Sequence, residues 1–256
     1  MRRKIQPQKS PDPMTPDDAR VLCVIPARGG SRRLPMKNIY PLLGKPSLEY
    51  TIESIREAAT PVCPVVLTDH AEIASLAQKL GVDVLDEPAE LATDSLVDDS
   101  VILSYVIDRL ENESRTFDII VVQYPCVPIK PSGIVDALIA FLKRTEADFV
   151  QTMALVSPDV HPYRMMLADD EGRTTHLVPM GPNMMSHEYP PYFCLTRAGY
   201  AITRAALKRL DGAPLQDLSI ALDRRGLVHK MEECVDIDNP EDVAWAEFLL
   251  NRKRDK

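Results

Sequence analysis

The stretch VLCVIPARGGSRRLPMKN, residues 21–38, decides how this chain folds. It opens with an apolar run, residues 21–26, of the kind that forms a buried β-strand. The glycine pair Gly29 and Gly30 and several cations follow directly. Because open α/β sheets bind ligands at the carboxyl ends of their strands, this loop is predicted to meet a ligand.

Apolar runs alternate with amphipathic stretches on the C-terminal side of this segment. This succession predicts βαβ units and a three-layer α/β fold, in which helices cover both faces of a mostly parallel, twisted sheet. Further strands are predicted at 64–67, 82–85, 118–122, 149–153 and 235–238, and helices at 46–58, 71–80, 95–110, 131–144 and 240–251. The helix at 95–110 is expected to turn Val97, Val101, Tyr105 and Ile107 inward.

The rhythm breaks between residues 157 and 200. This part is rich in Pro, Met, His and Gly, and we expect an inserted hairpin or lobe; the α/β pattern resumes at 201–210 and 215–222. Residues 1–20 are polar and proline-rich, which predicts a disordered extension before a single domain at 21–252. No run approaches the roughly 20 apolar residues of a membrane helix.

Composition bounds the function. The 256 residues carry a formal net charge of -8, which disfavours general binding to nucleic acids because that binding depends on Lys and Arg. The five cysteines are odd in number and form no CxxC pair, so we expect reduced thiols and a cytoplasmic protein.

Cations are concentrated in the loop after the first strand. Arg28, Arg32, Arg33 and Lys37 lie within ten residues, an arrangement that attracts a polyphosphate. Gly29 and Gly30 allow the backbone to approach such a ligand. The loop lacks both GxxxxGK[ST] and GxGxxG, and a solvated basic turn explains its composition about equally well.

A second constellation lies near the C-terminus, in VDIDNPED, residues 235–242. On a strand, Asp236 and Asp238 project to the same side, where a cation such as Mg²⁺ relieves their repulsion. Alternatively, the two acids end a solvated strand, and Asn239 caps the last helix. Asp69 and the segment Thr93, Asp94 and Ser95 are expected mainly to cap helices.

The run IPARGGSRRLPMKN, residues 25–38, resembles the signature of acylneuraminate cytidylyltransferases, to which CMP-Kdo synthetases are distantly related. Similarity extends in patches from about residue 21 to 250, and VDIDNPED resembles the closing motif of the family. Arg32 stands where the family usually has Lys. Met36 replaces a usual Gly, which suggests a different local backbone path. The segment QYPCVPIK, residues 123–130, departs from the family's QPTSPLR.

The resemblance implies a nucleotide-diphospho-sugar transferase-like fold and a set of site residues. Arg28, Lys37 and Arg32 are implied as catalytic residues at the phosphates of CTP. Asp236 and Asp238 are implied as ligands of Mg²⁺. The implied nucleotide pocket comprises Ala27, Arg28, Gly29, Gly30, Ser31, Asn38, Thr93, Gln123 and Tyr124. Tyr192 lies in HEYPPYF, residues 187–193, which resembles the family segment that lines the sugar site. Because a sugar carboxylate requires cations nearby, Lys130, Arg164 and Arg197 are further candidates for the sugar site, and Arg164 is a candidate for the site of its own or of a neighbouring subunit.

The reaction implied by the resemblance transfers CMP from CTP to the anomeric hydroxyl of a 2-keto-3-deoxy sugar acid of the sialic-acid type, with release of pyrophosphate. A homodimer, paired through the insertion, is also implied. Three alternatives stay open: another sugar such as Kdo, another nucleoside triphosphate, and a relative that binds nucleotides without catalysis.

Overall fold

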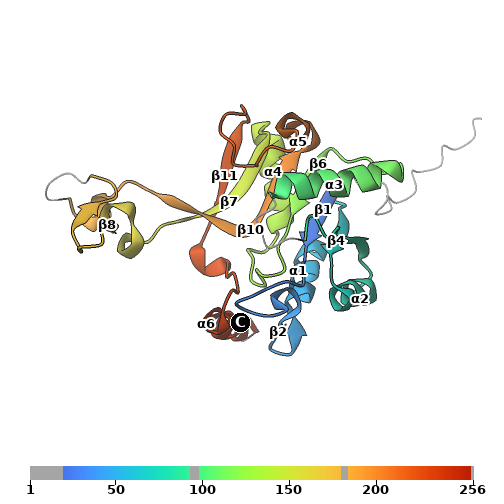
Figure 1. Cartoon of the computed structure of the whole chain (residues 1–256), viewed down its shortest axis with the longest axis horizontal. Helices are drawn as coiled ribbons and strands as arrows, with labels where there is room; N and C mark the ends of the chain where they lie inside the picture. The colour runs from blue at the N-terminus through green and yellow to red at the C-terminus, as the bar shows by residue number, and fades with distance from the viewer. Residues whose placement is uncertain (1–19, 93–97, 180–183, 255–256) are drawn as a thin grey trace, which may run out of the picture.

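The computed structural model describes residues 20–92, 98–179 and 184–254 (Figure 1). Apart from Arg20, whose guanidinium bonds the carboxylate of Asp118, the expected N-terminal extension lies outside these residues. The core of the molecule is a seven-stranded sheet with the order β11-β7-β10-β6-β1-β4-β5. Strand β10 runs antiparallel to both neighbours and every other pairing is parallel, as the mostly parallel prediction requires.

The first predicted strand lies inside this sheet. β1 (Val21–Pro26) pairs with β4 (Cys63–Thr68) on one side and with β6 (Ile119–Val122) on the other. Side chains of β1 are buried on both faces, which explains its uninterrupted apolar run. The remaining strands of the sheet are β5 (Asp83–Asp86), β7 (Phe149–Leu155), β10 (Phe193–Thr203) and β11 (Arg224–His229).

Helices cover both faces, so the molecule has the three expected layers. On one face, α3 (Asp99–Asn112) and α5 (Arg204–Leu210) bury side chains against alternate residues of β1, β4 and β6. On the other face lie α1 (Ser47–Arg56), α2 (Ala71–Lys79) and α4 (Ile134–Thr145). The last helix, α6 (Pro240–Arg254), packs near the small hairpin of β2 (Pro41–Leu42) and β3 (Lys45–Pro46).

The predicted start and inward face of one helix and the predicted cap of another were wrong. Helix α3 begins at Asp99, after an N-cap formed by Asp98, and it buries Ile102, Leu103 and Val106 instead of Val101 and Tyr105. The N-cap of α2 is His70, whose Nδ1 accepts from the backbone N–H of Glu72, and not Asp69. The expected cap residues Thr93, Asp94 and Ser95, together with Val97, lie outside the described residues.

Strand β11 was not predicted at all, because its sequence RRGLVH has two arginines and a glycine. The glycine makes room for a neighbouring side chain: a Cβ atom at Gly226 would lie 1.8 Å from Sδ of Met153 on β7, so the methionine would have to move. Conversely, residues 215–222 form no helix or strand. Close packing of one strand on another, which no pattern in the sequence encodes, decides this edge of the sheet.

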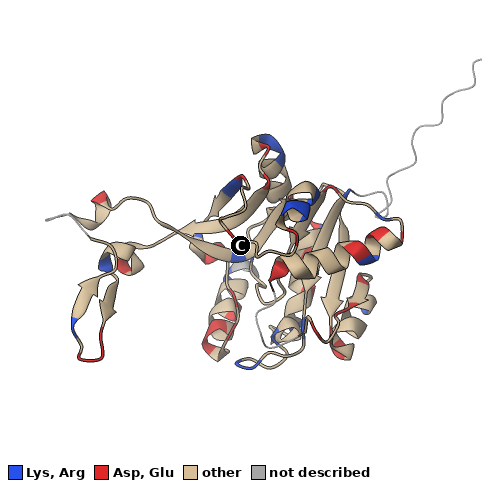
Figure 2. Ribbon diagram, turned by 45° about the horizontal axis from the view of Figure 1, so that its top comes forward, with Lys and Arg blue, Asp and Glu red and all other residues tan. Residues whose placement is uncertain are grey.

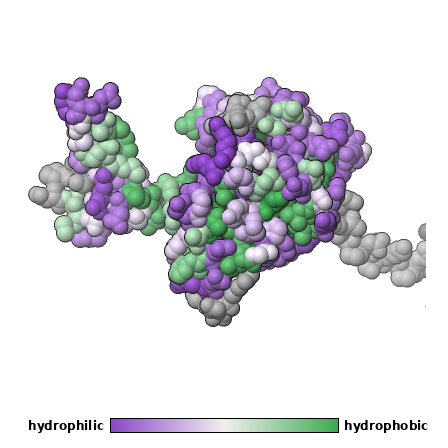
Figure 3. Space-filling view, turned by 60° about the horizontal axis from the view of Figure 1, so that its bottom comes forward, coloured by the Kyte–Doolittle hydropathy of each residue, from purple (hydrophilic) through white to green (hydrophobic). Residues whose placement is uncertain are grey.

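The insertion forms a lobe that projects from the main body (Figure 1). It contains the hairpin of β8 (Met166–Ala168) and β9 (Thr174–His176), and it returns to the sheet through β10, which begins at Phe193. The ring of His161 packs against Tyr163, Tyr189 and Tyr192 and forms the lobe's small centre. Figure 3 shows hydrophobic surface on the arm that joins the lobe to the body.

Charged residues of both signs are interspersed over the described ribbon (Figure 2). No helix within the described ranges is long and apolar enough to cross a membrane. All five cysteines are free thiols, and Cys23, Cys63 and Cys126 are buried.

Candidate functional site

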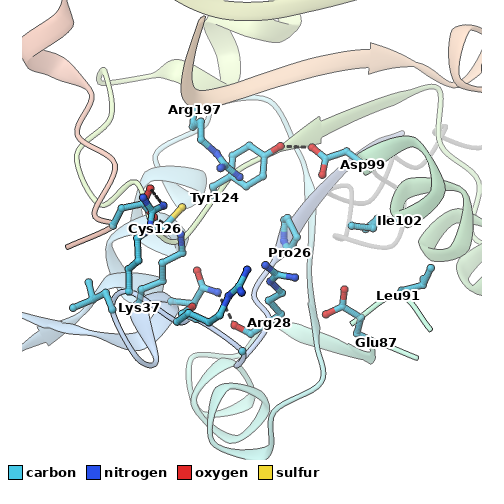
Figure 4. Close-up of a pocket in the computed structure, with 17 residues that line it drawn as sticks. Pro26, Arg28, Lys37, Glu87, Leu91, Asp99, Ile102, Tyr124, Cys126 and Arg197 are labelled. Atoms are coloured by element: carbon cyan, nitrogen blue, oxygen red, sulfur yellow. Dashed lines mark hydrogen bonds and ion pairs between the residues drawn. The ribbon is translucent and has the colours of Figure 1, made fainter. Parts of the chain in front are cut away.

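A cavity of 670 Å³ lies at the carboxyl ends of the central strands. Its walls come from the loop after β1, the segments after β5 and β6, the start of α3, and the segment before α6 (Figure 4). These segments are far apart in the sequence, yet parallel strands bring their carboxyl ends to one edge. The lining residues are Pro26, Arg28, Gly30, Ser31, Arg32, Arg33, Leu34, Lys37, Asn38, Glu87, Leu91, Asp99, Ile102, Tyr124, Cys126, Arg197 and Asp238.

The cationic loop and the C-terminal acids meet in this cavity. Nζ of Lys37 lies 2.7 Å from Oδ1 of Asp238, and Nη2 of Arg33 lies 2.7 Å from Oδ2 of the same carboxylate. The hydrogen bond from Lys37 holds the pKa of Asp238 below its ordinary value. Residues 201 positions apart are thus in direct contact, as the predicted site requires.

The loop keeps its shape through backbone contacts. Nδ2 of the buried Asn38 donates to the carbonyl of Arg28 over 2.8 Å, and the hydroxyl of Ser47 donates to the carbonyl of Lys37. Met36 adopts a φ of 55°, in the left-handed region that glycine enters without strain. The methionine therefore keeps a glycine-type conformation at this point instead of the different path suggested by its side chain.

The acidic segment is extended but is not a regular strand. Val235 forms a single bridge with Ile129, and the N–H of Ile237 donates to the carbonyl of Cys126. Val235 and Ile237 are buried, and the alternate residues Asp236 and Asp238 lie on the opposite side, as predicted. Asn239 caps α6, because its Oδ1 accepts from the N–H of Asp242.

The two aspartates offer ligands that suit Mg²⁺. Oδ1 of Asp236 is buried and receives no N–H or O–H from the described residues, and its Oδ2 lies 3.8 Å from Nε of Arg197. Asp238 is neutralised by Lys37 and Arg33. The described ranges hold no cluster of three His, Cys, Asp or Glu side chains, so a cation here needs oxygens from a substrate as well.

Arg197 occupies the side of the cavity next to Asp236. Its guanidinium lies over the ring of Tyr124, 4.5 Å from the ring centre (Figure 4). The hydroxyl groups of Tyr124 and Tyr200 both donate to Oδ2 of Asp99. This network fixes the ring and hence the cation above it, which leaves a positioned arginine facing the cavity.

Three residues of the predicted nucleotide pocket do not line the cavity, and a fourth lies outside the described ranges. The N–H of Gly29 donates to Oδ1 of Asp69 and is not available to a phosphate. Ala27 is fully buried. Gln123 is also fully buried, against Gly199, where a Cβ atom would lie 2.1 Å from its Nε2. Thr93 lies outside the described residues.

Lys130 corrects another expectation. Its ammonium is buried and donates to Oγ1 of Thr51 and to the carbonyls of Tyr124 and Val127. Burial lowers its pKa to about 8. With three acceptors engaged, Lys130 holds the loop after β6 together and offers no donor to a sugar.

Arg164 and Tyr192 are not brought to the cavity either. Both belong to the lobe, where Arg164 pairs with Asp159 and Tyr192 packs against His161. Neither residue lines the cavity that Arg197 lines. The expectation that they bind sugar at the same site is therefore not supported by the placement of a single subunit.

Sequence reasoning missed several lining residues. Glu87 follows β5, and Asp99 is the first residue of α3. In the sequence alone, their acidic side chains resemble ordinary surface residues. Leu91, Ile102 and Cys126 add apolar wall. Their only signal was position, since each lies near the carboxyl end of a sheet strand or at the start of a helix.

A family model described as Cytidylyltransferase matches residues 22–160. A CMP-N,N'-diacetyllegionaminic acid synthase from Legionella pneumophila is 28% identical over 238 residues, which cover 90% of this chain and 96% of that protein. A 3-deoxy-manno-octulosonate cytidylyltransferase from Bdellovibrio bacteriovorus is 25% identical over 265 residues, covering 91% and 98%.

A pseudaminic acid cytidylyltransferase from Campylobacter jejuni is 29% identical over 133 residues, or 52% of this chain, and the match spans about half of that protein (54%). Among solved structures, that of CMP:2-keto-3-deoxy-manno-octonic acid synthetase complexed with CTP is similar, with a TM-score of 0.69 and 17% identity. It covers 92% of this chain and 100% of its own, a likeness that shows the fold.

Proposed function

Because the chain belongs to the cytidylyltransferase family, we propose that it transfers CMP from CTP to the anomeric hydroxyl of a nonulosonic, sialic-acid-like sugar acid. The hydroxyl oxygen attacks the α-phosphorus and gives up its proton to solvent, the bond from this phosphorus to the bridging oxygen breaks, and pyrophosphate leaves. The observation that supports this most directly is the 2.7 Å contact between Lys37 and Asp238 in the cavity, which joins the phosphate loop to the acidic segment.

The loop binds the triphosphate. Arg28, Arg32 and Lys37 line the cavity and supply positive charge where the transferred group becomes more negative. Arg33 does the same from the cavity rim. Phosphate oxygens compete with Asp238 for Lys37 and Arg33, since a polyphosphate carries more charge than one carboxylate. Nucleotide binding therefore releases the carboxylate of Asp238.

The acidic segment is then free to bind a cation. Asp236 and Asp238 are the residues that would hold Mg²⁺, which polarises phosphate oxygens and offsets the charge on pyrophosphate when bound. The buried, unpaired Oδ1 of Asp236 supports this assignment, because such an oxygen is costly to bury without a partner.

The sugar acid occupies the side of the cavity near Arg197. A carboxylate pairs well with a guanidinium that is already held in place, and Arg197 is held by the ring of Tyr124. Positioning and charge stabilisation supply most of the rate enhancement, as in other phosphoryl-type transfers.

The lobe joins two copies of the chain into a homodimer. Its exposed apolar side chains support this: Val160, Met166, Leu167, Leu177 and Met185 are each 45% to 62% exposed. Exposed apolar surface of this kind is typical of subunit contacts. In the dimer, Arg164 and Tyr192 face the partner instead of their own cavity.

Pyrophosphate release is the test. The purified protein is incubated with Mg²⁺, each of the four nucleoside triphosphates and a panel of sialic, pseudaminic and legionaminic acids and Kdo. We expect release with CTP and a nine-carbon acid. Release only with Kdo, or only with another nucleotide, would change the substrate. Tight CTP binding without release from any acid would leave a nucleotide-binding protein instead of an enzyme.

A further inference from the structure

Glu87 is a buried acidic group that the proposed transfer does not use. It follows β5, and its N–H donates to the carbonyl of Thr68 at the end of β4 over 2.9 Å. The residue is only 9% exposed, yet it lines the cavity. Burial and the nearby carboxylate of Asp69 both disfavour the ionised form of this carboxyl group. A carboxyl group buried in this way is costly to ionise unless a partner or a ligand replaces the lost water.

Its place in the cavity is the end that a base would occupy. In Figure 4, Glu87 and Leu91 lie on the opposite side of the cavity from Lys37, with Arg28 between them. If the triphosphate lies at Lys37, the length of a nucleotide directs its base to the side of Glu87. The apolar side chains of Leu91 and Ile102 at this end suit the faces of a flat ring.

The surroundings of Glu87 favour its neutral form. Burial and the nearby carboxylate of Asp69, which follows β4, raise its pKa to about 7. Arg28, from the loop after β1, opposes this rise. A bound triphosphate offsets the charge of Arg28 and adds negative charge of its own, so the pKa of Glu87 rises further when a nucleotide binds.

We propose that Glu87 reads the cytosine of CTP as a neutral carboxylic acid, an inference that rests on the proposed function. Its carbonyl oxygen accepts from the exocyclic amino group N4, and its hydroxyl donates to the ring nitrogen N3. An ionised carboxylate cannot do this, because it would face the lone pair of N3 with a second acceptor. Uracil differs, since its N3–H donates to an ionised carboxylate directly.

Proton uptake follows from this pairing. Above pH 7, free Glu87 is mostly ionised, so cytosine binding draws a proton from the buffer and uracil binding does not. The affinity for CTP is therefore fully present below the pKa of free Glu87 and falls as the pH rises above it. The fall approaches about tenfold per pH unit.

Calorimetry at pH 8, in two buffers with different ionisation enthalpies, measures the protons taken up. For the wild-type protein we expect close to one more proton with CTP than with UTP; both share the titration of the triphosphate, which cancels in the difference. Glu87→Gln presents the same carbonyl and N–H without a titrating proton. This variant should keep its CTP affinity, lose the extra uptake, and lose the additional pH dependence between pH 8 and pH 9.

Glu90→Gln is the matched control, because Glu90 is exposed and lies three residues further along the same segment. It should behave as the wild type does. Equal uptake with CTP and UTP in the wild type, or uptake that persists in Glu87→Gln, would overturn the role of Glu87. If UTP binds too weakly to measure, the comparison of wild type and Glu87→Gln with CTP decides alone.

The two proposals fail separately. CTP turnover without proton uptake overturns the role of Glu87 and leaves the transferase proposal intact. CTP binding with uptake, but without pyrophosphate release from any sugar acid, overturns the transferase and leaves the base contact in place.

Discussion

The cavity and the lobe differ in how they are built. The cavity gathers charged side chains from segments at opposite ends of the chain and holds them by direct contacts, such as that between Lys37 and Asp238, which are 201 residues apart. The lobe gathers nearby residues around His161 and leaves large apolar side chains exposed. The described lining of the cavity comes from several segments of one chain, whereas the lobe presents the exposed apolar side chains on which the proposed dimer contact rests.

The largest effect is expected from the contact that defines the cavity. Lys37→Ala and Asp238→Asn should each lower the rate of pyrophosphate release by at least about 10³-fold, because both groups stabilise charge in the reaction. Circular dichroism should show an unchanged fold. Lys79→Ala, which removes an exposed lysine from the end of α2, is the control. Near-normal rates in both cavity variants would refute the assignment of these residues.

The second comparison sets one arginine of the cavity against one of the lobe. Arg197→Ala should raise the KM for the sugar acid roughly 10- to 100-fold, which corresponds to the loss of a positioned charge pair. Arg164→Ala should have little effect on the KM, since Arg164 pairs with Asp159 in the lobe. Equal effects of the two substitutions would show that the lobe reaches the cavity of a partner subunit.

Substitution of Lys130 tests whether this residue contributes to the stability of the fold or to sugar binding. Lys130→Met leaves Thr51 Oγ1 and two carbonyls without their donor and should lower the free energy of unfolding by roughly 2–3 kcal/mol. Urea denaturation measures this loss. Lys143→Met, on the exposed face of α4, should change stability by less than about 0.5 kcal/mol. A stable Lys130→Met variant with weaker sugar binding would restore the original expectation for this residue.

The smallest effect on folding is expected in the lobe. Leu167→Glu, at a side chain that is 56% exposed, should change monomer stability by less than about 0.5 kcal/mol but shift the mass from dimer to monomer. Light scattering after size-exclusion chromatography measures the mass. The exposed Glu171→Gln in the same hairpin should leave it unchanged. A dimer that survives Leu167→Glu would place the subunit contact elsewhere.

Apolar periodicity was sufficient for the layers of the fold but not for its edges. The buried strands β1, β4 and β6 were predicted because both of their faces need apolar side chains. The edge strand β11 was missed, since one glycine that fits against Met153 leaves no periodic signal. The start of α3 shifted by four residues because Asp98 caps it.

The sequence by itself determined which two segments carry the charged motifs, residues 21–38 and 235–242, because clustered cations and paired acids are local patterns. Only the tertiary structure decided which residues share the cavity. In the structure, Glu87 and Asp99 line the cavity, whereas Gln123 and Lys130 are buried and do not line it. The physical reason is that burial and contact depend on which strand ends become neighbours, and this order is set by the packing of the whole sheet.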